Sequence, residues 1–299
     1  MAGDVGAVEG WLFRARGVVG FVKGCLHPLP RLFVVLRLVE GRKTWSPLPQ
    51  HVPGAPGLRV EESRCLGGRR ALVLEPRAVG VQLVAPWDAA RRLRGCGSRT
   101  CRAAMDLLEH LSSAIGNAGV AGVTGGLAYA PSKAGDVDLV VYGGRAVERA
   151  YRALVDMREE GVTSPMPPRG HEWSRYDVEL ARHLNRSRVL LGVYRGVEYN
   201  VRLVPCTAPS RCTPARILGE ARIVGDVCGS AGFTTPAFYT LCSKDRPVIH
   251  VATWRLRYTE IPVGARVEAW GSLEEWCGGL RVLVPDHGGG MRLVRLRPG

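Results

Sequence analysis

Two aspartates, Asp136 and Asp138, stand two residues apart at the start of an apolar run that ends at Gly143. Side chains alternate along a strand, so both carboxylates point to the same face if this run is extended. Mg²⁺ is commonly held by one or two carboxylates together with the phosphates of a substrate. The spacing therefore predicts a Mg²⁺ or Mn²⁺ site, with a nucleoside triphosphate as the ligand that completes it.

A glycine pair, Gly125 and Gly126, stands ten residues upstream of the aspartates and follows a short apolar stretch. Because glycine has no side chain, backbone amides there can approach a triphosphate closely. The hydroxyls of Thr124 and Ser132 and the ammonium of Lys133 are further candidates for phosphate contacts. The plain alternative is a tight bend beside an acidic turn, with Lys133 as a solvated loop residue.

Periodic patterns predict the elements that position these residues. Apolar residues recur every three or four positions over 100–117, which is typical of an amphipathic helix. Strands are expected over 120–123 and 137–142, and a second helix over 145–158. Further along the chain, a hairpin turned at Arg195-Gly196 is expected before the chain leaves this region.

The flanking regions have a different composition and predict three parts in all. Residues 1–97 contain short β-type runs and are expected to form a mainly β domain. Residues 98–210 form an α/β (α+β) core of mixed sheet flanked by helices. Residues 211–299 consist of short strands separated by Gly and Pro turns, which predicts a small β-barrel-like domain.

The order of helix, strand, Gly125-Gly126, Asp136-x-Asp138 and strand over about residues 100–205 resembles the polymerase-beta nucleotidyltransferase superfamily. The resemblance implies a metal-bound nucleoside triphosphate and transfer of its nucleoside monophosphate to an acceptor hydroxyl. Such a reaction needs metal at the attacking and the leaving oxygens.

Flanking segments carry a second, less specific similarity. Gly20–Gly24, Gly232–Tyr239 and Gly264–Glu274 are similar to segments of archaeal predicted nucleotidyltransferases. This similarity implies an archaeal source and flanking domains that belong with the catalytic one. It supplies no substrate.

The superfamily has a third carboxylate on a later strand, where it completes a second metal site and accepts the proton of the incoming hydroxyl. Here Asn200 stands at the corresponding position, and an amide cannot accept that proton. Glu198, on the same strand face, is our candidate for the third catalytic acid, and Asp226 is the other. If neither acts, the remaining hypotheses are slow one-metal chemistry, or a non-catalytic nucleotide- or nucleic-acid-binding protein on the same scaffold.

The formal charge of +14, from 41 basic and 27 acidic residues, favours polyanionic partners. An arginine-rich composition explains the same charge equally well. A basic stretch with interleaved aromatic residues, including Trp173, is a weak candidate for stacking on RNA; its arginines are Arg175, Arg182, Arg186 and Arg188. RNA is therefore the expected acceptor, while an ordinary exposed helix is the alternative for this stretch.

Nine cysteines occur without the CxxC spacing of a zinc site. Cys96 with Cys101, and Cys206 with Cys212, are close enough in sequence for local disulfides, although buried thiols are the simpler expectation. No apolar run reaches the roughly 20 residues that span a bilayer, and the first residues do not resemble a secretion signal. We therefore expect a cytoplasmic protein without a membrane partner.

Overall fold

The computed structural model describes residues 6–44, 54–167, 175–243 and 246–295. Its contacts divide the chain into two compact units, of residues 1–153 with 194–214 and of residues 154–193 with 215–299. The architecture mixes helices with several sheets, in agreement with the predicted α+β class. None of the described helices is long and apolar enough to cross a membrane.

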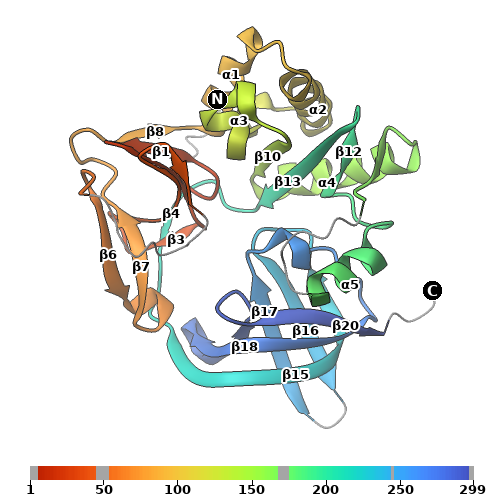
Figure 1. Ribbon diagram of the computed structural model, residues 1–299. Helices are drawn as coiled ribbons and strands as arrows, with labels where there is room; N and C mark the ends of the chain where they lie inside the picture. The colour runs from red at the N-terminus through yellow and green to blue at the C-terminus, as the bar shows by residue number, and fades with distance from the viewer. Residues whose placement is uncertain (1–5, 45–53, 168–174, 244–245, 296–299) are drawn as a thin grey trace. The chain divides into compact units, whose positions relative to one another are not determined.

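The first unit begins with an antiparallel sheet, drawn in red and orange in Figure 1. Within the described residues its seven strands are β1 (Leu12–Ala15), β2 (Val18–Val22), β4 (Leu32–Val39), β5 (Arg42–Lys43), β6 (Leu58–Ser63), β7 (Arg69–Leu74) and β8 (Gln82–Val84). They pair in the order β6-β7-β4-β2-β1-β8, with β5 on β4. Along β4, Leu32, Val34 and Leu36 enter the core, while Phe33 and Arg37 lie on the opposite, half-buried face.

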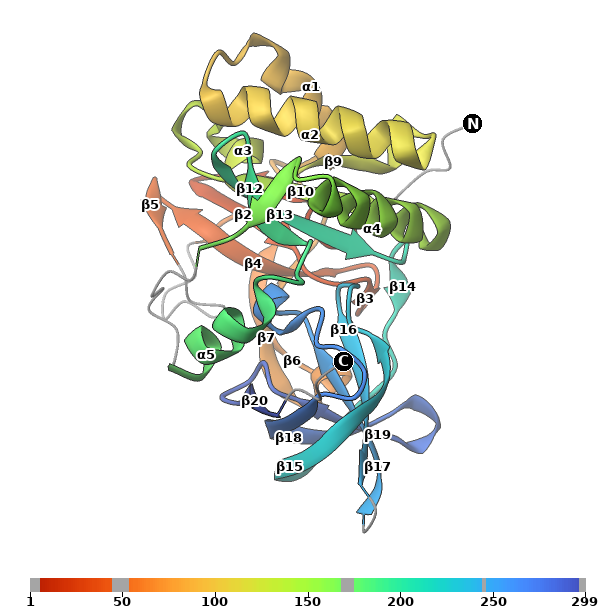
Figure 2. The same ribbon diagram turned by 90° about the vertical axis from the view of Figure 1, so that its right-hand side faces the viewer.

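Three strands of a second, five-stranded sheet lie in the same unit: β9 (Ala121–Val123), β10 (Val137–Tyr142) and β13 (Val197–Val204). The central strand β10 is antiparallel to β9 and parallel to β13. Its flanking helices are α1 (Pro86–Arg92), α2 (Arg99–Ile115) and α3 (Gly125–Tyr129). Figure 2 shows α2 lying across this sheet, with α4 (Gly144–Glu159) below it.

Helix α2 confirms the prediction made from its apolar spacing. Ser98 caps the helix by accepting a hydrogen bond from the Cys101 amide, and the helix ends at Gly116 in a left-handed conformation. The predicted hairpin turn is also present between β12 (Leu191–Tyr194) and β13, where Arg195 and Gly196 both have positive φ. Helix α4 and strand β12 run across the boundary between the two units, and β11 (Thr163–Pro165) belongs to the second.

Disulfide bonds join all cysteines except Cys277, which corrects the expectation of buried thiols. The pairs are Cys25–Cys206, Cys65–Cys212, Cys96–Cys101 and Cys228–Cys242. The predicted Cys96–Cys101 pair is confirmed, whereas the predicted Cys206–Cys212 pair is wrong. The reason is that β14 (Ser210–Arg211) pairs with β3 (Leu26–His27), which brings this segment beside residues distant in sequence.

The second unit contains a β-barrel, as expected for the C-terminal part. Its strands are β15 (Arg216–Ala231), β16 (Ala237–Ser243), β17 (Arg246–Thr253), β18 (Arg266–Trp276), β19 (Leu280–Val284) and β20 (Gly290–Arg295). The order is β15-β16-β17-β19-β18-β20, and β18 also pairs with the long strand β15, which closes the barrel (Figure 1). Tyr239, Leu241 and Val251 fill the interior with Leu180 and Leu184 of α5 (Arg175–Leu184).

Candidate functional site

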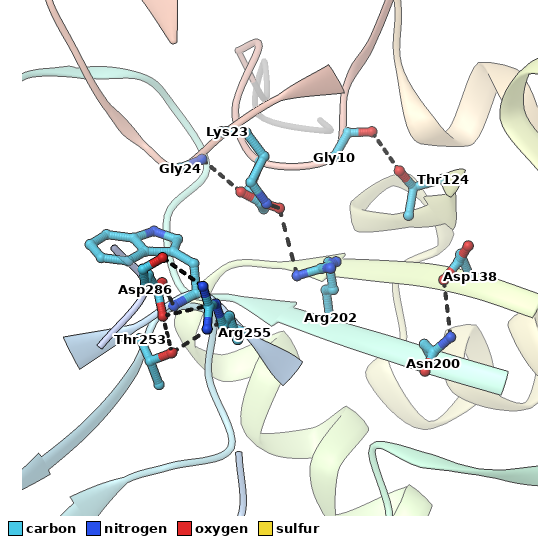
Figure 3. Close-up of polar contacts among 12 residues, drawn as sticks. Gly10, Lys23, Gly24, Thr124, Asp138, Asn200, Arg202, Thr253, Arg255 and Asp286 are labelled. Atoms are coloured by element: carbon cyan, nitrogen blue, oxygen red, sulfur yellow. Dashed lines mark hydrogen bonds and ion pairs between the residues drawn. The ribbon is translucent and has the colours of Figure 1, made fainter. Parts of the chain in front are cut away.

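The candidate site begins where β10 and β13 run side by side. Asp138 stands opposite Asn200 in register, and the Asn200 Nδ2 donates to the Asp138 Oδ1 over 3.2 Å (Figure 3). Glu198, Asn200 and Arg202 alternate with buried residues and therefore share one face of the sheet. Asp136 directly precedes β10 and is level with Glu198 in the register. The expected acids thus lie on one face.

Gly125 lies directly against the Asp138 carboxylate. Its φ is +57°, and a Cβ placed on it would be 1.8 Å from the Asp138 Oδ2. Gly126 is different, because its Cβ would be 3.4 Å from the Ala134 Cβ. The two glycines begin the short helix α3 directly after Thr124. Of the two predicted glycines, only Gly125 is at a position where the local geometry leaves no room for a side chain.

The Asp138 carboxyl is electrostatically unusual. The pKa of Asp138 is raised from 3.8 to about 6, first by burial and then by the negative charge of Asp136. Arg202, the hydrogen bond from Asn200 and Arg37 act in the opposite direction. Because two nearby carboxylates repel each other when both are ionised, a cation between them would relieve that repulsion. The pair is therefore suited to bind a divalent metal.

A buried charge cluster from the N-terminal sheet adjoins this face. Glu9 is 2% exposed, and its carboxylate accepts hydrogen bonds from the Lys23 Nζ and, over 2.7 Å, from the Gly24 amide. The Arg202 guanidinium lies 3.8 Å from the same carboxylate. Burial acts to raise the pKa of Glu9, but Lys23 and Arg202 hold it below its ordinary value. Arg202 thus connects this cluster with the strand that carries Asn200 (Figure 3).

Arg37 adds a further positive charge from β4. Burial lowers the pKa of Arg37, and the charge of Arg202 lowers it further, while Asp138 and Glu9 act in the opposite direction. Lys23, Arg37 and Glu9 could not be assigned to the site from the sequence, because no local motif connects them with the aspartates. Arg202 could have been predicted to lie on the face of the site, since it follows Asn200 by two residues on the same strand.

The predicted phosphate-binding hydroxyls have different surroundings. Thr124 is buried, and its hydroxyl donates to the Gly10 carbonyl over 2.9 Å, so this hydroxyl anchors the N-terminal segment (Figure 3). Its amide also donates to the Asp138 carbonyl over 2.9 Å. Ser132 and Lys133 are exposed on the turn that leads into Asp136. Of the predicted set, these two present their side chains to solvent.

The two candidates for a third acid belong to different units. Glu198 is half-buried on β13, on the face that carries Asn200. Asp226 belongs to the second unit, where it pairs with Arg266 over 3.3 Å. Glu198 is therefore the candidate that shares a sheet with Asp138.

The donor set fits a single hard cation. Within the described ranges, no group of three or more His, Cys, Asp and Glu side chains is arranged to hold a metal. Asp136 and Asp138 provide two carboxylates, which match a Mg²⁺ ion that keeps its other positions for phosphate oxygens and water. The amide of Asn200 replaces the third carboxylate, so these residues fit one metal better than two.

The predicted basic stretch does not form one exposed surface. Arg188 is 2% exposed and donates to the carbonyls of Arg257 and Thr259 within the second unit, which contradicts its assignment to a nucleic-acid surface. Arg182 and Arg186 are exposed. Arg175 begins α5, and Trp173 lies outside the described residues.

A search with models of known protein families finds no match to this chain, and a search among curated proteins finds none either. The interpretation of the site therefore depends on the motif residues and their geometry.

Proposed function

We propose that the first unit binds a nucleoside triphosphate with a divalent metal and transfers its nucleoside monophosphate to an acceptor hydroxyl, with RNA as the expected acceptor. The observation that carries this proposal is the position of the Asp138 carboxylate. It lies against Gly125 and accepts a hydrogen bond from Asn200, and the negative charge of Asp136 raises its pKa. A purely structural acidic turn would not require this close approach.

In the proposed reaction the acceptor oxygen forms a bond with the α-phosphorus, the bond to the β-phosphate breaks, and pyrophosphate leaves. Asp136 and Asp138 would hold the metal, which supplies positive charge to the reacting phosphate oxygens. Glu198 would accept the proton of the attacking hydroxyl. Arg202 and Arg37 place fixed positive charge near Asp138, where charge is needed to stabilise a polyphosphate.

A second hypothesis is a non-catalytic protein that binds nucleotide or nucleic acid on the same scaffold. The specific observation behind it is Asn200, since its amide cannot accept a proton and binds a cation more weakly than a carboxylate does. On this hypothesis Asp136 and Asp138 still bind a metal-nucleotide, but no bond to an acceptor forms.

Incubation with each α-labelled nucleoside triphosphate, Mg²⁺ or Mn²⁺ and total archaeal RNA tests the proposal. The proposal predicts label in RNA, or in another acceptor, for the native protein and none for Asp136→Asn/Asp138→Asn. Asp88→Asn is the matched control, because Asp88 is an exposed acid of the same unit that pairs with Arg91. Nucleotide binding without any transfer would favour the second hypothesis, and neither binding nor transfer would refute both.

A further inference from the structure

The barrel of the second unit has a specific strand order. Numbered along the barrel, its five closing strands pair in the order 1-2-3-5-4-1, from β15 through β16, β17, β19 and β18 back to β15. The third and fifth strands, β17 and β19, are parallel, and the other pairs are antiparallel. This is the order of OB-fold barrels, whose strands 2 and 3 commonly bind oligonucleotides or oligosaccharides. Because a fold alone does not assign a ligand, the outer face must be considered by itself.

That outer face carries an aromatic cluster. Ala252, Val282 and Val284 form its buried base, on which the rings of Phe238, Trp254 and Trp276 pack. The three rings are half-buried, with centroid separations of 6.1 Å for Phe238 and Trp276 and 6.3 Å for Trp254 and Trp276. The cluster is separate from the barrel interior, which Tyr239 and its neighbours fill. It is therefore not needed to complete the core of the barrel.

Polar contacts hold both tryptophans in place. The Trp276 Nε1 donates to the Glu274 carboxylate over 2.8 Å, and the Trp254 amide donates to the Asp286 carboxylate over 2.7 Å. The Thr253 hydroxyl donates to the same Asp286 carboxylate over 2.6 Å (Figure 3). The ring of Trp276 and the backbone of Trp254 are thus held before binding, and groups fixed in this way lose little conformational entropy when a ligand stacks on them. The arrangement suits a flat partner.

Positive charge lies beside the rings. Arg255 follows Trp254 and donates to the Asp286 carbonyl over 2.6 Å, with its Nε 3.7 Å from the Asp286 carboxylate. Aromatic rings for bases combined with arginines for phosphates are the features by which proteins bind single strands. The chain as a whole is also strongly basic, with a formal charge of +14.

We propose that the cluster on the outer face of the barrel, formed by Phe238 of β16, Trp254 directly after β17 and Trp276 at the end of β18, binds single-stranded nucleic acid by stacking its bases. Arg255 contacts the phosphates. This binding needs neither a metal nor a nucleoside triphosphate, so it stands or fails separately from nucleotidyl transfer.

The test uses the full chain and an oligouridylate of about 16 nucleotides, the upper end of the site size of one such barrel. Affinity is measured without metal or nucleotide, by anisotropy of a labelled strand and by quenching of tryptophan fluorescence. Trp254→Leu and Trp276→Leu should each weaken binding by about 5- to 100-fold, because stacking of one base contributes that much. Trp270→Leu is the matched control, since Trp270 is a half-buried barrel tryptophan outside the cluster, with Arg222 over its ring at 5.4 Å.

Three further measurements use the same proteins. Heparin has charge without bases, so its binding should not change in the Trp254 and Trp276 variants. In the native protein, bound oligouridylate should protect both tryptophans from N-bromosuccinimide, a result that does not depend on how a variant folds. Oligothymidylate in place of oligouridylate shows whether the face distinguishes DNA from RNA. Equal affinity in all variants, tighter binding of duplex than of single strand, or no protection would overturn the proposal.

Discussion

The contact between Gly125 and Asp138 makes Gly125→Ala the sharpest perturbation of the proposed site. The new Cβ would be 1.8 Å from the Asp138 Oδ2, whereas real Cβ contacts are essentially never below 3.0 Å. The carboxylate or the α3 backbone therefore has to move by about 1 Å or more. A displacement of about 1 Å in a catalytic group can cost about 100-fold in rate. The left-handed backbone adds about 1–2 kcal/mol of strain for any residue with a Cβ.

We expect Gly125→Ala to slow transfer of labelled nucleotide about 100-fold and to lower the free energy of unfolding by at least about 1–2 kcal/mol. Gly126→Ala is the matched control, because its Cβ meets only Ala134 at 3.4 Å and its change in stability should stay within about 1 kcal/mol. Initial rates and denaturant unfolding curves measure both effects. If Gly125→Ala transfers and unfolds like the native protein, the contact with Gly125 does not position Asp138, and the reasoning is wrong.

Three further predictions concern the same unit. Because its pKa is raised, ionisation of Asp138 costs stability as pH rises from 3.8 to about 6. Without metal, Asp138→Asn should therefore be about 3 kcal/mol more stable than the native protein at pH 7, as measured by denaturant unfolding, and the gain should vanish below pH 3.8. An unchanged gain at low pH would contradict this. Lys23→Met leaves the Glu9 carboxylate buried without its ammonium partner and should lower the free energy of unfolding by about 3–5 kcal/mol in the same assay. Lys133→Met, at an exposed lysine, should change it by almost nothing. Equal losses would show that the ion pair is unimportant. Cys25→Ser/Cys206→Ser removes a disulfide between residues 181 apart in sequence and should lower the free energy of unfolding by about 5 kcal/mol. Recovery of a disulfide-linked Cys206–Cys212 peptide by mass spectrometry would contradict the pairing itself.

Local patterns predicted the elements that carry the aspartates. The spacing of apolar residues located α2 to within two residues, and the apolar run 137–142 is the strand β10. The alternation of side chains also put Glu198 on the same strand face as Asn200, as the burial pattern of β13 confirms. These successes have one cause, because helix and strand periods follow from the backbone and do not depend on distant parts of the chain.

Long-range contacts were beyond the reach of the same reasoning. Sequence proximity suggested Cys206 with Cys212, but cysteines pair according to the fold. Pairing of β14 with β3 brings Cys206 beside Cys25, and Cys212 pairs with Cys65. The charge cluster of Glu9, Lys23 and Arg202 escaped notice for the same reason, since its members come from separate segments.

The expected boundary near residue 97 depended on an arginine-rich stretch, and the contacts of the site explain why the first unit does not divide there. The Tyr142 hydroxyl of β10 donates to the Glu9 carbonyl over 2.7 Å, and the Thr124 hydroxyl donates to the Gly10 carbonyl. Both hydroxyls are buried, so removing the N-terminal segment would leave them without these acceptors at a cost of about 1–3 kcal/mol each. The same segment carries Glu9, which balances Arg202 on the face of Asp138. Residues 98–210 therefore contain the predicted motif but not the whole environment that sets its charge.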